Sequence, residues 1–423
     1  MNEKIICSLE DWDSILNYWR PNGSSKTWYI KEMKKLSIPH MWGEWNVYTE
    51  QGEMFEEGHL RNAITPMHSS LVKYTPKDEI GDSKHIYIIN VYTHDFFTHN
   101  SHIGLKCISP EYVEDIKCGK AKILMFFIYE GYSGIWGNSD FEMIERWRNE
   151  MGFPVNSIYY VCGNLLSEKI VKERGFGYKA RGIHYFEPWN QYKGPMVGFT
   201  PQPEKYLFLS YNRQPRHHRI RFMIDLYERN LINDGLISLN KIDRIPYRVG
   251  PNTELFFQEN TPLIIDSLPE LRYNLACNIT TEDFERTFVS VVTETLVDDG
   301  TLFFSEKIWK PIMVGHPFMI YGNKGSLSYL KSIGYKTFDR WWDESYDDEP
   351  DKDRRSIMIA NELLKLKTKS IDELKVIRNE MLEVINHNKE NYNKVYQEKY
   401  SEGDQSSTIR EVLLEMWQEL KND

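Results

Sequence analysis

The sequence predicts an α/β protein with two Rossmann-like domains and a helical segment at the C-terminus that packs back on the core. Short apolar runs of strand type alternate with helical patterns, which indicates strand–helix–strand units around mostly parallel sheets. A stretch rich in Pro and Gly, residues 188–203, separates two such series. We therefore expect an N-terminal α/β domain over residues 1–190, a second one over 204–400 and a closing helix within 401–423.

The first domain has a clear pattern only after residue 84, because the first eighty residues are irregular and rich in Trp and Gly. Beyond that point the apolar runs 85–92, 122–129 and 157–162 predict strands. Residues 141–151 have the spacing of an amphipathic helix.

The second domain repeats this alternation. Strands are predicted at 206–210, 236–239, 287–292, 317–321 and 335–338. Helices are predicted at 216–230, 306–314 and 326–333. The remainder of the chain is predicted to be helical, and the last helix has one apolar face. That face consists of Ile409, Val412, Leu413, Met416, Trp417 and Leu420. We expect it to pack on the protein itself, the alternative being a membrane or partner surface.

Composition limits the possible functions. The 423 residues are enough for two domains, and 41% apolar with 27% charged residues is typical of a globular protein. A formal net charge of -10 argues against a general nucleic-acid coat. One basic groove remains possible, and its candidate residues are Lys84, Lys120, Lys122 and Arg181.

The cysteines and the N-terminus indicate the compartment. The 5 cysteines are scattered without a C-x-x-C pair, so neither a zinc site nor a disulfide framework is predicted. Residues 1–10 lack the pattern of a signal peptide, and no apolar run is long enough for a membrane span. We expect a cytoplasmic protein.

The most informative segment runs from a buried strand into a helix. The strand pattern of residues 289–293 ends at Glu294, and Ser305 is a suitable N-cap for a helix that begins at Glu306. An acid in the first turn is ordinary stabilisation, but Lys307 opposes the helix dipole there. A cation at this position becomes useful when an anion binds at the same helix end.

Residues 289–321 resemble the donor-binding signature of the α-1,3-fucosyltransferase family. Glu294 is similar to the acid at the end of the family's strand, and Ser305-Glu306-Lys307-Ile308-Trp309 matches its second segment almost in order. The resemblance implies that Glu306 contacts the nucleotide ribose and Lys307 the diphosphate. The Glu294–Glu306 spacing is longer than the usual pattern by about two residues, which a loop absorbs.

The same resemblance implies a two-domain glycosyltransferase of the GT-B type. Phe303 stands near the position of a ligand-contacting Tyr in that family. Residues 322–347 are also similar to a group of bacteriophage glycosyltransferases. Because some phage enzymes glycosylate hydroxymethylated DNA bases, the resemblance makes such a base a candidate acceptor beside a glycan.

A second group of candidate residues lies between a predicted strand and helix. Asn212 and Arg213 occupy the turn, and Arg216 and Arg219 follow at intervals of three. Arginine is suited to bidentate phosphate contact, so we predict donor binding by Asn212, Arg213 and Arg216. The alternative is a solvated basic face, and the spacing of three prevents every guanidinium from reaching one site.

A catalytic base is expected from the N-terminal domain, where acids follow predicted strands. Glu130 is the first candidate, Asp95 the second and Glu187 a third. The alternative for each is an acid that caps a turn. The histidines at 94, 99 and 102 match no standard metal pattern, so no metal site is predicted.

These features predict sugar transfer from a UDP- or GDP-linked donor to an acceptor hydroxyl, with inversion and without a metal ion or other cofactor. The acceptor is a glycan or a hydroxymethylated DNA base. The alternative from another class is a non-catalytic nucleotide- or sugar-binding module, and a purely structural phage protein is a weaker one. The sequence leaves the oligomeric state open.

Overall fold

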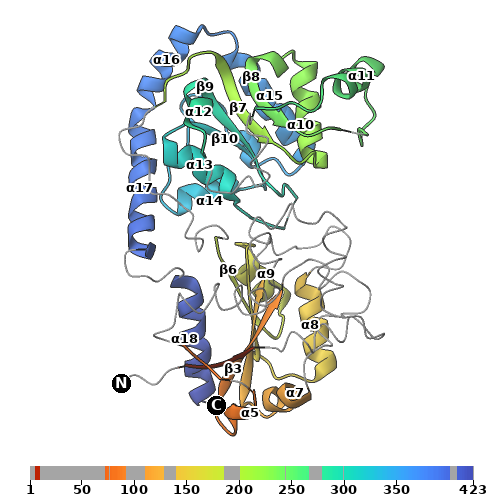
Figure 1. The fold of residues 1–423 in the computed structure, drawn as a ribbon, viewed down its shortest axis with the longest axis vertical. Helices are drawn as coiled ribbons and strands as arrows, with labels where there is room; N and C mark the ends of the chain where they lie inside the picture. Colours follow the sequence, from red (N-terminus) through yellow and green to blue (C-terminus); the bar gives the residue numbers. More distant parts are fainter. Residues whose placement is uncertain are drawn as a thin grey trace, which may run out of the picture. The chain divides into compact units, whose positions relative to one another are not determined.

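The computed structural model describes residues 5–9, 72–75, 77–91, 110–127, 140–184, 201–242, 244–265, 279–298, 300–400 and 407–422. The chain divides into two compact units, shown in Figure 1. The first unit spans Met1–Trp189 and Lys399–Asp423, and the second spans Asn190–Glu398. Each contains a parallel sheet with helices, which confirms the predicted α/β class.

The first unit contains a sheet in the order β2-β1-β3-β4-β5-β6, with every neighbouring pair parallel. Its strands are β1 (Ile5–Leu9), β2 (Val72–Tyr74), β3 (His85–Val91), β4 (Ala121–Phe127), β5 (Ile158–Cys162) and β6 (Lys179–Gly182). Its helices are α5 (Lys77–Ile80), α7 (Pro110–Lys117), α8 (Asp140–Met151), α9 (Ser167–Arg174) and α18 (Ser407–Asn422). The predicted strands at 85–92, 122–129 and 157–162 correspond to β3, β4 and β5.

The two faces of this sheet bury different partners because successive strand residues point to opposite sides. Tyr87 and Ile89 belong to a core shared with α7, α8 and α9. Ile86 and Ile88 belong to a second core, shared with the apolar face of α18. The expectation that the last helix packs on the protein itself is therefore confirmed.

Ion pairs border the contact between α18 and the sheet. The Lys122 ammonium lies 2.6 Å from the Glu419 carboxylate, and the Lys179 ammonium lies 2.7 Å from that of Glu415. Burial alone would raise the pKa of Glu419, but hydrogen bonds from Lys122 and Lys179 outweigh it and lower the pKa to about 2. The ionised form of Glu419 is therefore favoured by the folded state.

The second unit contains a sheet in the order β10-β9-β7-β8, again parallel throughout. Its strands are β7 (Tyr206–Asn212), β8 (Gly235–Leu239), β9 (Thr287–Thr293) and β10 (Phe318–Tyr321). Its α-helices are α10 (His217–Glu228), α11 (Pro251–Asn260), α12 (Thr281–Glu285), α13 (Glu306–Val314), α14 (Ser326–Ser332), α15 (Lys352–Leu366), α16 (Ile371–Glu380) and α17 (Leu382–Tyr400). Two short 3-10 helices, η3 (Ile232–Asp234) and η4 (Ser345–Asp347), complete it.

Helices cover both faces of this sheet, as Figure 1 shows. On one side α10 and α15 pack together, joined by a hydrogen bond from Ser356 to the buried Asp225. On the other side α12 and α13 contribute Phe284 and Val314 to a cluster with Leu209 of β7. Every residue of β9 is buried, which is typical of a central strand in a parallel sheet.

One predicted strand is wrong. Residues 335–338 are buried at Tyr335 and Phe338 but form no strand. Both backbone groups of Lys336 bond to the side chain of Asn388 in α17 instead of to a neighbouring strand. The apolar residues that suggested a strand pack as a loop, with Phe338 against Phe318 of β10.

The opening region also differs from the prediction, because β1 and β2 lie within the first eighty residues. These strands contain only five and three residues, too few for a periodic signal. The structure places both in the first sheet through parallel pairing.

We predict that Glu419→Gln lowers the free energy of unfolding by about 1 kcal/mol at pH 7, the scale of a partly exposed ion pair. Since the folded-state pKa is below the ordinary 4.5, the stabilisation is present above pH 4.5 and is lost as the pH falls toward 2. Urea unfolding of wild type and variant at pH 7 and pH 2.5 measures this difference.

The control is Glu411→Gln, an exposed position on the same helix whose carboxylate has no ion pair within the described part of the chain. It should have almost no effect at either pH. An equal loss in both variants would contradict a role for the ion pairs.

Candidate functional site

The strand order of the second unit creates one position where a ligand site is expected. β7 comes first in this sheet, and the next strands along the chain lie on opposite sides of it, β8 on one side and β9 on the other. In open parallel sheets, ligands bind at such a reversal, outside the carboxyl ends of the strands. β7 ends at Asn212 and β9 at Thr293.

Buried hydrogen bonds join these two strand ends. The Thr293 hydroxyl donates to Asn212 Oδ1 at 2.5 Å, and Asn212 Nδ2 donates to Ser210 Oγ at 2.8 Å. The Ser210 hydroxyl in turn donates to the carbonyl of Val291 at 3.1 Å. The Asn212 amide therefore makes hydrogen bonds that join β7 to β9. This geometry does not support its predicted contact with a ligand.

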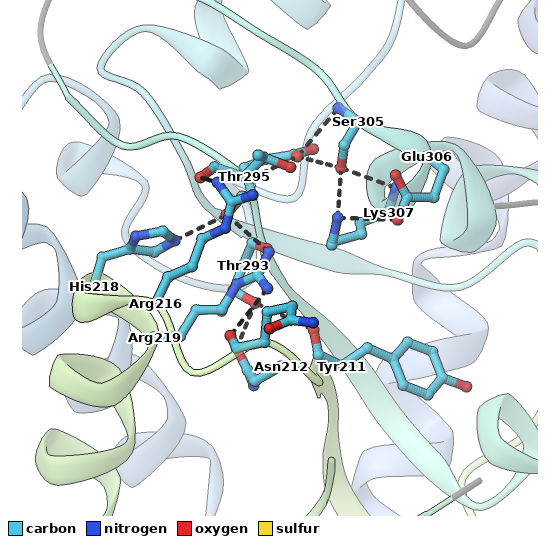
Figure 2. A network of polar contacts seen from close by, with 12 residues as sticks. Tyr211, Asn212, Arg216, His218, Arg219, Thr293, Thr295, Ser305, Glu306 and Lys307 are labelled. Atoms are coloured by element: carbon cyan, nitrogen blue, oxygen red, sulfur yellow. Dashed lines mark hydrogen bonds and ion pairs between the residues drawn. The ribbon is translucent and has the colours of Figure 1, made fainter. Parts of the chain in front are cut away.

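Two side chains at the start of α10 bind the last carbonyls of β9, as Figure 2 shows. Arg219 Nη2 donates to the carbonyls of Thr293 and Glu294 at 3.2 and 3.3 Å. His218 Nε2 is 2.9 Å from the carbonyl of Glu294, so Nε2 carries the proton and donates it.

The charges of these two side chains differ. Burial, followed by the neighbouring Arg219, lowers the pKa of His218 to about 3, so the imidazole is neutral at pH 7. Burial lowers the pKa of Arg219 only to about 10, so its guanidinium stays protonated at pH 7. A buried positive charge therefore lies beneath the strand junction.

The other two arginines of this segment lie nearer the surface. Arg216 is exposed and donates from Nη1 to the carbonyl of Thr295 at 2.8 Å. Arg213 is half-buried, and its side chain makes no hydrogen bond or ion pair with any described residue. The structure thus leaves the Arg213 guanidinium available at the β7–α10 turn, where phosphate contact was predicted.

Glu294 connects β9 to the beginning of α13. Its side chain is fully buried, and Oε2 accepts hydrogen bonds from the backbone N–H and the hydroxyl of Ser305, at 3.1 and 2.5 Å. Burial raises the pKa of this carboxyl in spite of the nearby Lys307. Glu294 therefore positions Ser305, and it lies too deep to contact a ligand in this conformation.

Ser305 is the N-cap of α13, as predicted. Its φ of -88° and ψ of -179° are extended, and its Oγ accepts from the backbone N–H of Lys307. The same oxygen accepts from Lys307 Nζ at 3.1 Å, and that ammonium also donates to Glu306 Oε1 at 3.0 Å. One hydroxyl thus joins the buried carboxylate to the cation at the helix start (Figure 2).

Glu306 and Lys307 form a partly exposed ion pair, with 20% and 18% of their side chains accessible. Burial alone would raise the pKa of Glu306, but the ammonium groups of Lys307 and Lys310 hold it below 4.5. The ionised form of Glu306 is therefore favoured at neutral pH. Glu306 and Lys307 lie at the helix end where the backbone N–H groups favour an anion.

A small pocket lies beside this helix start. Leu209, Phe284 and Pro311 contribute apolar groups to its lining, and Lys307 and Lys310 also line it. Tyr211 forms another wall, with its hydroxyl donating to Asp283 Oδ2 at 2.8 Å. The Lys310 ammonium lies 5.9 Å from the centre of the Tyr211 ring.

The sequence prediction did not include Lys310 and Tyr211, although the spacing of each residue in its helix or strand indicated its position. Lys310 follows Lys307 by three residues, which places the two on one helix face. Tyr211 precedes Asn212 in a strand and must point to the opposite side of the sheet. Phe303 is only 2% exposed, so the structure does not support its predicted contact with a ligand.

The predicted catalytic acids cannot be compared with this site. Glu130, Asp95 and Glu187 lie outside the described residues, as do the histidines at 94, 99 and 102. Where side chains are described, no group of three or more His, Cys, Asp or Glu is placed to hold a metal ion. No helix in the described ranges is both long and apolar enough to cross a membrane.

The four bases proposed for a groove in the first unit already have partners. Lys120 pairs with Asp82 and Asp115, and Lys122 pairs with Glu419. Arg181 contacts Glu168 and Glu415, and Lys84 donates to the carbonyl of Leu420. These contacts reduce the positive charge that the four side chains offer to a polyanion.

Comparison with models of known protein families and with curated proteins gave no match. The resemblance of residues 289–321 to the α-1,3-fucosyltransferases therefore stays a prediction.

We predict that Ser305→Ala destabilises the protein by about 2–3 kcal/mol, because it removes the N-cap of α13 and the hydroxyl that donates to the buried Glu294. The loss should be larger at pH 7 than at pH 4. The reason is that the pKa of Glu294 is already raised and rises further without Ser305, so the ionised carboxyl becomes less favourable in the folded state. Denaturant unfolding at both pH values measures the change.

The matched control is Ser332→Ala, an exposed serine at the end of α14 whose hydroxyl donates only to the carbonyl of Tyr329. We expect it to change stability by less than about 0.5 kcal/mol. Equal effects of the two alanines would contradict the role given to Ser305.

Proposed function

We propose that the protein is a glycosyltransferase that moves a sugar from a nucleotide-sugar donor to an acceptor hydroxyl. The observation that carries the proposal is the placement of Lys307 at the N-terminus of α13, tied through Ser305 to Glu294 at the end of β9. A lysine opposes the helix dipole there unless an anion binds, and a diphosphate is the anion that a nucleotide-sugar supplies.

In this proposal the donor diphosphate binds at the start of α13. Lys307, Lys310 and the N–H groups of the first turn supply positive charge on one side, and Arg213 supplies it from the β7–α10 turn. Glu306 binds hydroxyls of the ribose. In this proposal the donor is a UDP- or a GDP-linked sugar.

The proposed reaction is an inverting transfer. A base takes the proton of the acceptor hydroxyl, the oxygen attacks the anomeric carbon, and the bond to the diphosphate breaks. The leaving diphosphate gains negative charge, which Lys307, Lys310 and the helix end stabilise without requiring a metal ion. Fixed positive groups of this kind act more strongly in the transition state than in the ground state.

We further propose that the two units are Rossmann-like domains of a GT-B enzyme, with the acceptor and the base contributed by the first unit. Glu130 is the preferred base and Asp95 the second choice, because both follow strands of the first sheet. The acceptor is a glycan or a hydroxymethylated DNA base. A non-catalytic binding module would bind donor and never turn over, so donor hydrolysis without acceptor argues against that alternative.

The first experiment is a thermal-shift screen of UDP-, GDP- and CMP-sugars. A ligand that binds only the folded protein raises Tm, and we expect one nucleotide series to do so with wild type. Lys307→Ala should keep the fold, lose most of this shift and lose about 2–4 kcal/mol of transition-state stabilisation in sugar transfer. Turnover close to wild type in this variant would remove the proposed role.

Glu306→Gln is the matched control, because it releases Lys307 from its ion pair while leaving the lysine in place. We expect the variant to bind inorganic pyrophosphate at least as tightly as wild type and the nucleotide-sugar more weakly. Weaker binding of both ligands would show that Glu306 acts only by positioning Lys307.

For Glu130→Gln we expect donor binding to be retained and transfer to be lost, because the amide cannot accept the hydroxyl proton. Thermal shift with the donor and product formation with the acceptor measure the two properties separately. If transfer survives, the base lies elsewhere and Asp95→Asn becomes the corresponding variant.

A further inference from the structure

The second unit has a concentration of positive charge that extends beyond the proposed donor site. Residues 212–221 and 240–250 contain Lys or Arg at seven positions and only one acid, Asp243, in a chain whose net charge is -10. The cations are Arg213, Arg216, Arg219, Arg221, Lys241, Arg244 and Arg248. Among them, Arg219 is buried beneath the strand junction and Arg221 is paired with Asp225.

The structure brings the two segments together. The backbone N–H of Asn240 donates to the carbonyl of Arg213 at 2.9 Å. The Tyr247 hydroxyl donates to the carbonyl of His217 at 3.1 Å, and the Arg221 guanidinium lies 5.9 Å from the Tyr247 ring. The loop after β8 is therefore held against the start of α10.

Arg244 and Arg248 of this loop are exposed, and neither side chain has an ion pair or hydrogen bond with a residue that the structure describes. The side chain of the half-buried Arg213 also has no ion pair or hydrogen bond with a described residue. This contrasts with Lys120, Lys122 and Arg181 in the first unit, each of which is paired with a carboxylate. Guanidinium groups that have no described carboxylate partner can be stabilised by a bound anion.

The strand order places the loops that carry these groups in a row. Because β8, β7 and β9 are neighbours, the loops that follow them lie side by side along the carboxyl edge. The row runs from Arg244 and Arg248 after β8, through Arg213 and Arg216 after β7, to Lys307 after β9. Two strand spacings are about 10 Å, a length over which one DNA strand presents about three phosphates.

We propose that this row, the β8–β7 arginine strip, binds the phosphodiester backbone of a nucleic acid and leads it to the sugar donor at α13. The strip is longer than one diphosphate. The guanidinium group of arginine can donate two hydrogen bonds to the oxygens of one phosphate. The inference deepens the proposed function, since it favours a nucleic-acid base over a glycan as acceptor. The transfer of a sugar to a nucleic-acid base rests on the proposed function, whereas the binding of nucleic acid to the strip does not depend on it.

The test uses the full-length double variant Arg244→Gln/Arg248→Gln and a fluorescently labelled 30-base-pair DNA duplex. Anisotropy titrations between 50 and 200 mM salt give the affinity and its salt dependence. Removing two phosphate contacts should reduce the slope of log K against log salt by about 1.8 and weaken binding at least about tenfold at low salt. The Tm and the shift produced by the sugar donor should stay at wild-type values.

The control is Lys172→Gln/Lys369→Gln, which removes the same charge from exposed positions in α9 and after α15. It should bind the duplex like wild type. No binding by wild type at 50 mM salt, or equal slopes for wild type and the arginine variant, would overturn the proposal. Competition by heparin as effective as that by DNA would show a surface that recognises anionic glycans instead.

A fall in donor affinity of the arginine variant would assign Arg244 and Arg248 to the donor site and also overturn the proposal. This outcome is separate from failure of the glycosyltransferase proposal, which appears as absence of a donor shift in wild type. The two proposals therefore fail in different measurements.

Discussion

The hydrogen bonds between the buried carboxyl of Glu294 and Ser305 connect the central strand of the second unit to the helix that holds the proposed site. A buried carboxyl is unfavourable without donors, and Ser305 supplies two of them. The buried carboxyl of Glu294 requires hydrogen-bond donors, and this requirement fixes the position of Ser305. Since Ser305 also caps α13 and accepts from Lys307, the location of this partly exposed cation follows from the same contact.

The junction of β7 and β9 is held by polar groups at a place where a parallel sheet is normally apolar. Thr293, Asn212 and Ser210 form a buried chain of hydrogen bonds between the strands. From the other side, His218 and Arg219 satisfy carbonyls that the sheet leaves open at the end of β9. Such networks are stable only when their members are bonded, and that restriction keeps the strand ends in one arrangement.

Charge is distributed unequally between the described parts of the two units. In the first unit the cations near α18 are bound by its glutamates, so they contribute to folding of the C-terminal helix. In the second unit Arg213, Arg244 and Arg248 have no ion pair with a described acid, whereas Lys307 is paired with Glu306. A paired cation stabilises the protein locally, whereas an unpaired one at a strand end raises the local potential and attracts anions.

The sequence alone was sufficient for the α/β class, most of the longer strands, the start of α13 and the apolar face of α18. These features depend on residues a few positions apart, so local spacing and capping determine them. It did not reveal that residues 335–338 run as a loop, because Asn388 binds their backbone from a distant helix. The buried position of Glu294 and the roles of Asn212, His218 and Arg219 were decided by the tertiary structure. Each depends on β9 lying beside β7, and the order of strands in a sheet follows from contacts between segments far apart in the chain.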